Sequence, residues 1–337
     1  MKRILITGGA GFIGSNFIEH LLTNEAITVY NLDKLTYAGN LENLKSVENH
    51  ERYHFIHGDI CDRGLVEDLF AKHDITDVIH FAAESHVDNS IKNPGAFIET
   101  NIVGSFNLLD VAYKTWMDAP NKVKPAYADS RFLHVSTDEV YGTLGKEGLF
   151  SETTSYAPNS PYSASKAASD FVVRSYFHTY GMNVVTTNCS NNYGLNQHDE
   201  KLIPTIIRKC LSEENIPIYG DGLNIRDWLF VLDHCKGIEI AFNTGVSGET
   251  YNIGGRNERT NMYIVDTICS ILDDKLPRQN GSSYKDLKSF VEDRAGHDFR
   301  YAIDASKIEN NLGWKADENF ETGILKTVSW YINKYNK

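Results

Sequence analysis

Short apolar segments alternate with amphipathic segments of helical period through the first 190 residues of the chain. The apolar segments predict strands, and the amphipathic segments predict the helices between them. Alternation of this kind produces right-handed crossovers and a parallel sheet covered by helices on both faces. We therefore expect an α/β fold with a Rossmann-type, doubly wound parallel sheet. The predicted strands are 3–7, 27–32, 53–57, 78–81, 132–136 and 183–187, and the predicted helices are 12–23, 62–72, 95–117 and 161–180.

The alternation weakens after about residue 190, and the polar stretch 118–130 interrupts it earlier as a predicted surface loop. We expect residues 1–190 to form a cofactor-binding domain that carries the catalytic residues. Residues 191–337 then form mainly a smaller C-terminal α/β substrate-binding region, with a soft boundary and interleaved segments. The later predicted elements are the strands 216–219, 228–231 and 250–253 and the helices 233–244, 261–273 and 321–335.

Composition and charge argue against several classes of function for this chain. The formal net charge of −12 disfavours binding to nucleic acid, which needs a basic face. No apolar run is long enough to span a bilayer, and the early glycines leave no room for a signal peptide. The five cysteines are far apart and fit reduced thiols better than a disulfide framework or a zinc site. We expect a cytoplasmic protein with no metal, nucleic-acid or membrane partner.

A glycine-rich turn follows the first predicted strand and opens the first helix. Its spacing, Gly8, Gly11 and Gly14, differs from the standard dinucleotide fingerprint but allows the same tight turn and close approach of a pyrophosphate. Asp33 ends the second strand and is the expected acceptor for an adenosine ribose, which favours NAD over NADP. Lys34, directly after it, weakens that preference. The turn and the aspartate together predict an NAD site.

A tyrosine and a lysine occupy one face of the helix predicted at 161–180. Ser160 and Pro161 supply a helix cap and a first-turn proline, and Tyr162 and Lys166 are four residues apart. A tyrosine with its usual pKa of about 10 is a poor base at neutral pH. We expect Lys166 and a bound nicotinamide to lower the pKa of Tyr162 so that it can act as one.

An acid pair, Asp138 and Glu139, follows the strand that ends in Ser136 and Thr137. Hydride transfer alone does not need these carboxyls, whereas elimination of water needs an acid and a base. Two adjacent carboxyls in a closed pocket raise one another's pKa, which leaves one able to donate a proton. An acidic surface loop is the alternative. The position at the carboxyl end of a buried strand favours catalysis.

Several segments together carry a resemblance over nearly the whole chain: 8–15, 83–88, 136–142, 162–166, 188–194, 200–204, 226–228 and 293–297. The chain resembles the extended short-chain dehydrogenase/reductases of the nucleotide-sugar branch, and is similar to the bacterial 4,6-dehydratases that act on dTDP-glucose. The resemblance implies an NAD-dependent hydro-lyase that makes a 4-keto-6-deoxy sugar for deoxysugar biosynthesis, with NAD regenerated in each cycle.

The same resemblance implies the roles of the residues. Thr137 and Tyr162 contact the 4-hydroxyl of the sugar, and Tyr162 takes its proton with Lys166 beside it. Glu139 removes the C5 proton, and Asp138 protonates the departing 6-hydroxyl. The cofactor-binding residues expected from the motifs and the resemblance are Gly8, Gly11, Phe12, Ile13, Gly14, Asp33, Lys34, Thr36, Asp59, Ile60, Phe81, Ala82, Ala83, Ser85, Thr100, Tyr162, Lys166 and Asn192.

The nucleotide-sugar pocket is expected from the resemblance. Arg226 and Arg294 suit a diphosphate because guanidinium makes bidentate, charge-assisted bonds. Ser85 and His86 either touch the sugar or cap the following helix. The expected substrate-binding residues are Ser85, His86, Thr137, Asn191, Lys201, Leu202, Pro217, Tyr219, Arg226, Asn261, Arg294 and His297.

The chain departs from the family pattern at 195–199, where an aromatic residue and a proline are usual, and at Leu232, where an acid is common. The first departure bears on loop closure and base preference. Two other functions stay open: another nucleotide-sugar enzyme of this fold (a 4-epimerase or a uronate decarboxylase), and a non-catalytic NAD-binding regulatory protein. By analogy we also expect a homodimer formed through the helices 95–117 and 161–180.

Overall fold

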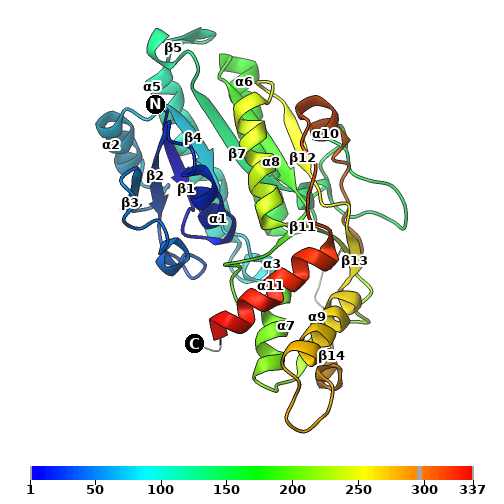
Figure 1. The fold of residues 1–337 in the computed structure, drawn as a ribbon. Helices are drawn as coiled ribbons and strands as arrows, with labels where there is room; N and C mark the ends of the chain where they lie inside the picture. The colour runs from blue at the N-terminus through cyan, green and yellow to red at the C-terminus, as the bar shows by residue number, and fades with distance from the viewer. Residues whose placement is uncertain (1, 294–297, 336–337) are drawn as a thin grey trace.

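A parallel sheet of seven strands forms the centre of the molecule in the computed structural model, which describes residues 2–293 and 298–335 (Figure 1). Every neighbouring pair in this sheet is parallel, so the predicted Rossmann-type α/β fold is confirmed. In spatial order the strands are β12 (Thr250–Ile253), β8 (Val184–Cys189), β7 (Arg131–Thr137), β4 (Asp77–His80), β1 (Lys2–Thr7), β2 (Ile27–Asp33) and β3 (Tyr53–His57).

Alternating side chains along each strand build a core on each face of the sheet. Ile4 and Ile6 of β1 pack in one core with α1 (Phe12–Leu21) and α8 (Val231–Thr244). Leu5, between them, packs in the other core. That second core is closed by α2 (Arg63–His73), α5 (Ser105–Trp116) and α6 (Pro161–Tyr180). The period of two places apolar residues on both faces, as a buried parallel sheet requires.

The helix predicted at 95–117 is interrupted. It consists of α4 (Pro94–Phe97), a π-helical segment η2 (Ile98–Gly104) and α5. Asn101 lies in η2, where its side chain accepts from the backbone N–H of Glu84 at 2.8 Å and donates to the Ser165 hydroxyl at 2.8 Å. These tertiary hydrogen bonds compete with regular helical geometry, and π-bulges of this kind occur often at functional sites.

The second part of the chain forms its own apolar core below the main sheet in Figure 1. However, α8 and β12 belong to the main sheet and its covering layer, so segments of the two predicted domains interleave. The division at residue 190 stays a prediction. The elements around the second core are β9 (Asn191–Tyr193), α7 (Leu202–Leu211), β10 (Ile216–Tyr219), β11 (Ile225–Phe230), β13 (Glu258–Thr260), α9 (Asn261–Lys275), η5 (Tyr284–Leu287), β14 (Lys288–Val291) and α11 (Phe320–Tyr335).

Short elements complete the fold. The stretch predicted as a loop at 118–130 holds a two-stranded ribbon and a helical turn. Within residues 2–293 and 298–335, no helix is long and apolar enough to cross a membrane. The remaining elements are η1 (Leu41–Leu44), α3 (Val87–Lys92), β5 (Met117–Ala119), β6 (Lys122–Val123), η3 (Pro125–Tyr127), η4 (Asp138–Tyr141) and α10 (Ser306–Leu312).

Candidate active site

One cavity of about 320 Å³ runs along the carboxyl ends of the central strands, where ligands bind in open α/β sheets. The turn after β1 and the end of β2 form one end of its wall, and the end of β7 and the start of α6 form the other. The end of β8 and the segment after it (189–192), together with Gln197, His198, Glu200 and Lys201, close the same wall. All the residues expected to bind cofactor line this cavity.

The glycine turn leaves no room for side chains. Gly8 has a φ of +72°, and a Cβ there would lie 2.7 Å from the Ala82 backbone. A Cβ on Gly14 would lie 2.4 Å from the carbonyl oxygen of Gly8. Gly11 is the N-cap residue of α1, and within the described residues this helix N-terminus has no side-chain capping hydrogen bond. This bare helix N-terminus on the cavity wall fits the pyrophosphate of a dinucleotide.

Acidic residues mark the adenosine end of the cavity. Asp33 accepts from the backbone N–H of Ala10 at 2.9 Å and of Leu35 at 2.8 Å, so its carboxylate ties the end of β2 to the glycine turn. A carboxylate offers about four lone-pair sites, which leaves capacity for a ribose hydroxyl. The Lys34 amine forms an ion pair with the Asp59 carboxylate at 2.6 Å. Because Asp59 neutralises the Lys34 charge, that charge is not free to attract the 2′-phosphate of NADP.

The acid pair lies at the other end of the cavity, where β7 passes into η4. Thr137 caps η4, because its hydroxyl oxygen accepts from the Glu139 N–H at 3.3 Å. Asp138 is 2% exposed, and its Oδ2 has no hydrogen-bond partner among the described residues. Burial raises the pKa of Asp138 well above its usual value, and the nearby charges of Glu139 and Asp227 raise it further. A raised pKa favours the neutral carboxyl, which is the form that can donate a proton.

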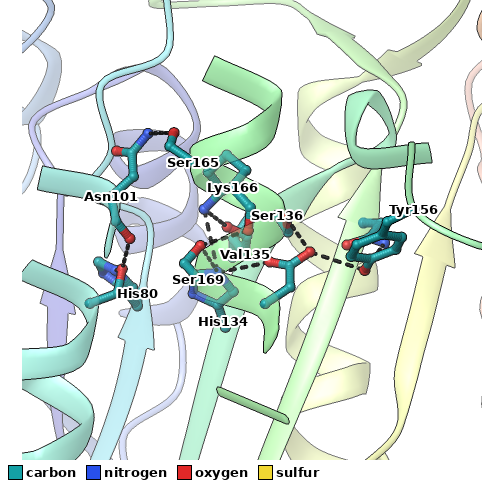
Figure 2. Close-up of polar contacts among 12 residues, drawn as sticks. His80, Asn101, His134, Val135, Ser136, Tyr156, Ser165, Lys166 and Ser169 are labelled. Carbon is teal, nitrogen blue, oxygen red and sulfur yellow. Dashed lines mark hydrogen bonds and ion pairs between the residues drawn. The ribbon is translucent and has the colours of Figure 1, made fainter. Parts of the chain in front are cut away.

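Tyr162 sits in the first turn of α6, which begins with a reciprocal cap between Ser160 and Ser163. Burial, followed by the charge of Glu139, raises the pKa of Tyr162 well above its usual value. Lys166 is not among the causes of this shift. The expectation that Lys166 and a bound nicotinamide lower this pKa stays a prediction. The amine of Lys166 donates to the Val135 carbonyl at 2.9 Å (Figure 2).

Several buried polar atoms on the catalytic side of the wall lack a partner among the described residues. They are Oδ2 of Asp138, Oδ1 of Asn191 and Asn192, and Oε1 of Gln197. A buried acceptor left unsatisfied costs about 1–3 kcal/mol, so such a cluster fits a ligand rich in hydroxyl and N–H donors. Gln197, together with His198 and Glu200, was not among the sequence predictions. Their nearness to the motifs at 188–194 and 200–204 was the available signal.

The expected substrate residues divide into two groups. Ser85, Thr137, Asn191 and Lys201 line the cavity, and Lys201 donates to the Ser85 carbonyl at 3.3 Å. His86 caps α3 through its Nδ1, 3.4 Å from the Asn89 nitrogen, so the capping alternative is observed.

The remaining expected substrate residues are absent from the described cavity wall. Arg226 is only 6% exposed, and its guanidinium donates to the backbone carbonyls of Ile225, Asp298 and Phe299. Leu202, Pro217, Tyr219 and Asn261 lie on α7, β10 and α9 of the second part. Arg294 and His297 lie outside the described residues. The binding roles of this group stay predictions.

The fold and the cavity define a Rossmann-type protein with a dinucleotide site beside a buried acid and a tyrosine. The family model described as GDP-mannose 4,6 dehydratase matches residues 5–327. A dTDP-glucose 4,6-dehydratase of Xanthomonas campestris is 55% identical over 332 residues, covering 98% of this chain and 93% of the relative. One of Neisseria meningitidis is 52% identical over 336 residues, covering 99% and 94%. The chain belongs to the dTDP-glucose 4,6-dehydratase family, as its motifs indicated.

Solved structures agree with this assignment. The dTDP-glucose 4,6-dehydratase of Streptomyces venezuelae, solved with NAD, has a TM-score of 0.89 at 43% identity and covers 99% of this chain and 98% of its own. That of Bacillus anthracis, also with NAD, has a TM-score of 0.87 at 42% identity, covering 100% and 98%. A UDP-glucose 4-epimerase of Thermotoga maritima has a TM-score of 0.85 at 28% identity, covering 99% of both chains. The fold is thus shared across several reactions, whereas the sequence is closer to the dehydratases.

Proposed function

We propose that this chain converts dTDP-glucose to dTDP-4-keto-6-deoxy-glucose as an NAD-dependent hydro-lyase in deoxysugar biosynthesis. The single observation that carries the proposal is Asp138, a buried carboxyl whose pKa is raised by burial and by Glu139, on the wall shared with Tyr162. Hydride transfer at a sugar carbon needs no such acid. Loss of water does need one, because hydroxide is a poor leaving group until it is protonated.

The residues divide the work by position. Bound NAD supplies oxidation of C4 and later reduction of C6, and is regenerated. The Thr137 hydroxyl positions the 4-hydroxyl, and Tyr162 removes its proton. Glu139 takes the C5 proton, which the 4-ketone has made acidic. Asp138 gives its proton to the 6-hydroxyl as water leaves, and C5 is then reprotonated.

The acid pair also separates this proposal from its alternatives. An epimerase on the same fold needs the tyrosine and lysine but no acid for a leaving hydroxyl. A purely regulatory NAD-binding protein would gain nothing from a buried Asp138 that lacks a protein partner for its Oδ2 within the described chain. A thymidine nucleotide is supported by the relatives, which are dTDP-glucose 4,6-dehydratases.

Incubation with dTDP-glucose deuterated at C4 tests the proposed function. We expect a 4-keto-6-deoxy product with deuterium at C6 and no net consumption of added NAD. Deuterium retained at C4, lost to solvent, or present in a 4-epimer would contradict the proposal. Absence of turnover despite bound NAD would favour the regulatory alternative.

A homodimer is the proposed assembly. The packed helices α5 and α6, with η2, carry large exposed apolar side chains: Ile98, Val103, Phe106 and Phe171, the last 57% exposed. A second copy would cover them as a four-helix interface. Light scattering should give twice the chain mass, and a monomer at all concentrations would rule the dimer out. We further propose a cytoplasmic location, supported by five free cysteines.

A further inference from the structure

Lys166 is a buried residue of the cavity wall. It is 4% exposed, and its amine donates to the Val135 carbonyl at 2.9 Å and lies 3.4 Å from Nε2 of His134 (Figure 2). A buried ammonium is costly unless an opposite charge compensates it. The carbonyl and the imidazole provide hydrogen-bonding atoms but no negative charge.

A carboxylate lies one helical turn further along α6. Asp170 is also buried, and its Oδ1 lies 3.1 Å from the same Nε2 of His134. Its Oδ2 accepts from the Ser136 hydroxyl at 2.9 Å and from the Tyr156 hydroxyl at 3.0 Å. Asp170 therefore contacts the residue directly before Thr137 on β7. Its Oδ1 has no hydrogen-bond partner among the described residues, and it lies near the imidazole nitrogen that the Lys166 amine approaches.

We propose that Asp170 is a positioning residue for the dehydratase reaction: it supplies the buried counter-charge that keeps Lys166 protonated, and through Ser136 it fixes the strand end that carries Thr137. This inference rests on the proposed function. Asp170 does not line the described cavity wall, so it acts through Lys166 and Ser136 and not on the sugar itself.

The charges around the pair support this role. Burial lowers the pKa of Lys166, and Asp170 is the first of the charges that raise it again. Burial raises the pKa of Asp170 to about 6, while Lys166 and the hydrogen bonds from Ser136 and Tyr156 act in the opposite direction. Above that pH the carboxylate is ionised. The other titratable groups that face the pair are His80 on β4, His134 on β7, Tyr141 on η4, Tyr156 on the loop before α6 and Cys189 on β8.

These neighbours are uncharged near neutral pH, so they do not replace the carboxylate. Burial lowers the pKa of His80 and His134 well below the usual value. Burial raises the pKa of Tyr141, Tyr156 and Cys189. Asp170 is therefore the group in this network whose negative charge can compensate a protonated Lys166.

The Asp170→Asn variant removes the charge while keeping an oxygen that can accept from Ser136 and Tyr156. Lys166 should then lose its proton at lower pH. We expect the alkaline limb of the kcat/KM profile to move toward neutrality by about 1–3 pH units, the range for loss of a nearby opposite charge. Competitive acetylation of lysines across pH, read by mass spectrometry, should show the same shift for the Lys166 peptide.

Two matched variants control for packing. Asp170→Glu keeps the charge, so its alkaline limb should stay near that of the unaltered protein even if turnover falls. Asp77→Asn alters another buried carboxylate, which pairs with Lys2 at 2.8 Å at the opposite end of the sheet. It should leave the profile unchanged. Identical profiles for Asp170→Asn and the unaltered protein would overturn the inference.

A milder variant tests the second contact and serves if Asp170→Asn does not fold. Ser136→Ala removes the hydroxyl that joins Asp170 to the end of β7. Misplacement of Thr137 should lower kcat about tenfold with little change in KM. An unchanged kcat would overturn the positioning role. Failure of the unaltered protein to dehydrate dTDP-glucose would instead contradict the proposed function.

Discussion

The two ends of the cavity are built on different physical grounds. At the cofactor end, the wall is backbone, and function depends on the side chains that glycines leave out: a single Cβ on Gly8 would meet the Ala82 backbone at 2.7 Å. At the catalytic end, the wall is made of buried polar side chains, and function depends on the neutral form that burial favours at Asp138.

This difference determines how each end should respond to substitution. Adding one methyl group at the cofactor end should impair binding, because the steric space is already full. Removing one ionisable group at the catalytic end should impair turnover and leave NAD binding nearly intact, because the shape of the cavity is preserved. The following substitutions test that contrast.

The largest effect is expected for Tyr162→Phe. The ring can keep its edge contact with Phe97, at 6.3 Å between centroids, while the base is lost. Turnover should fall about 10²–10⁴-fold with bound NAD unchanged. Tyr176→Phe on the same helix, which removes a hydroxyl 3.3 Å from Asp110, is the matched control and should keep near-normal activity. A large loss of bound NAD from Tyr162→Phe would contradict the proposal that the catalytic end affects turnover and not cofactor binding.

Gly8→Ala should produce the opposite pattern. Strain at φ +72° and the clash with Ala82 together should weaken NAD retention about 100-fold, equivalent to roughly 3 kcal/mol. Gly281→Ala provides the control, since Gly281 has a φ of +75° but nothing within 4 Å of its ideal Cβ. NAD content after gel filtration measures both. Equal behaviour of the two variants would show that the close approach is unimportant.

Asp33→Asn should have a smaller effect at the same end. The carboxylate holds the N–H groups of Ala10 and Leu35, and an amide offers only one oxygen for both of them and the expected ribose hydroxyl. We expect about tenfold weaker NAD binding, as for loss of one hydrogen bond to a charged group. Calorimetry on protein stripped of cofactor measures it. Unaltered affinity would remove Asp33 from the binding site.

The smallest effect concerns the pH dependence of stability. The pKa of Asp138 is higher in the folded protein than in the unfolded chain, so the folded state binds more protons, and stability is lost as pH rises from about 4 through the folded pKa. Asp138→Asn removes this loss. It should raise the free energy of unfolding by about 1 kcal/mol at pH 8 and hardly at all at pH 4. Denaturant titrations at the two pH values measure the difference. A gain of equal size at both would contradict a raised pKa.

Sequence-based prediction was most accurate for helix bounds that are set by local capping residues. The helix at 161–180 has the predicted bounds, because Ser160 and Pro161 start it and Gly181, with a φ of +68°, ends it. The π-helical interruption at 98–104 was not predicted; Asn101 within it makes side-chain bonds to residues distant in sequence, which local periodicity does not reveal. Short strands such as β9 and β13 also escaped, because three residues carry too little periodicity.

The candidate site follows the same rule. Motif spacing identified the residues of the glycine turn and the acid pair, and the structure brings them to one cavity. The direction of the Tyr162 pKa could not be read from spacing, because it depends on burial and on where the Lys166 amine points. Nothing in the sequence indicated that the Arg226 guanidinium donates to the backbone carbonyls of Asp298 and Phe299.

A single-turnover experiment on Asp138→Asn tests the central claim most directly. The claim is that Asp138 acts as the acid for water loss and not for oxidation at C4. After mixing with dTDP-glucose, absorbance of the reduced cofactor should rise at nearly the normal rate and persist, while formation of the 4-keto-6-deoxy product falls at least 100-fold. Equal slowing of the absorbance rise and of product formation would contradict the account.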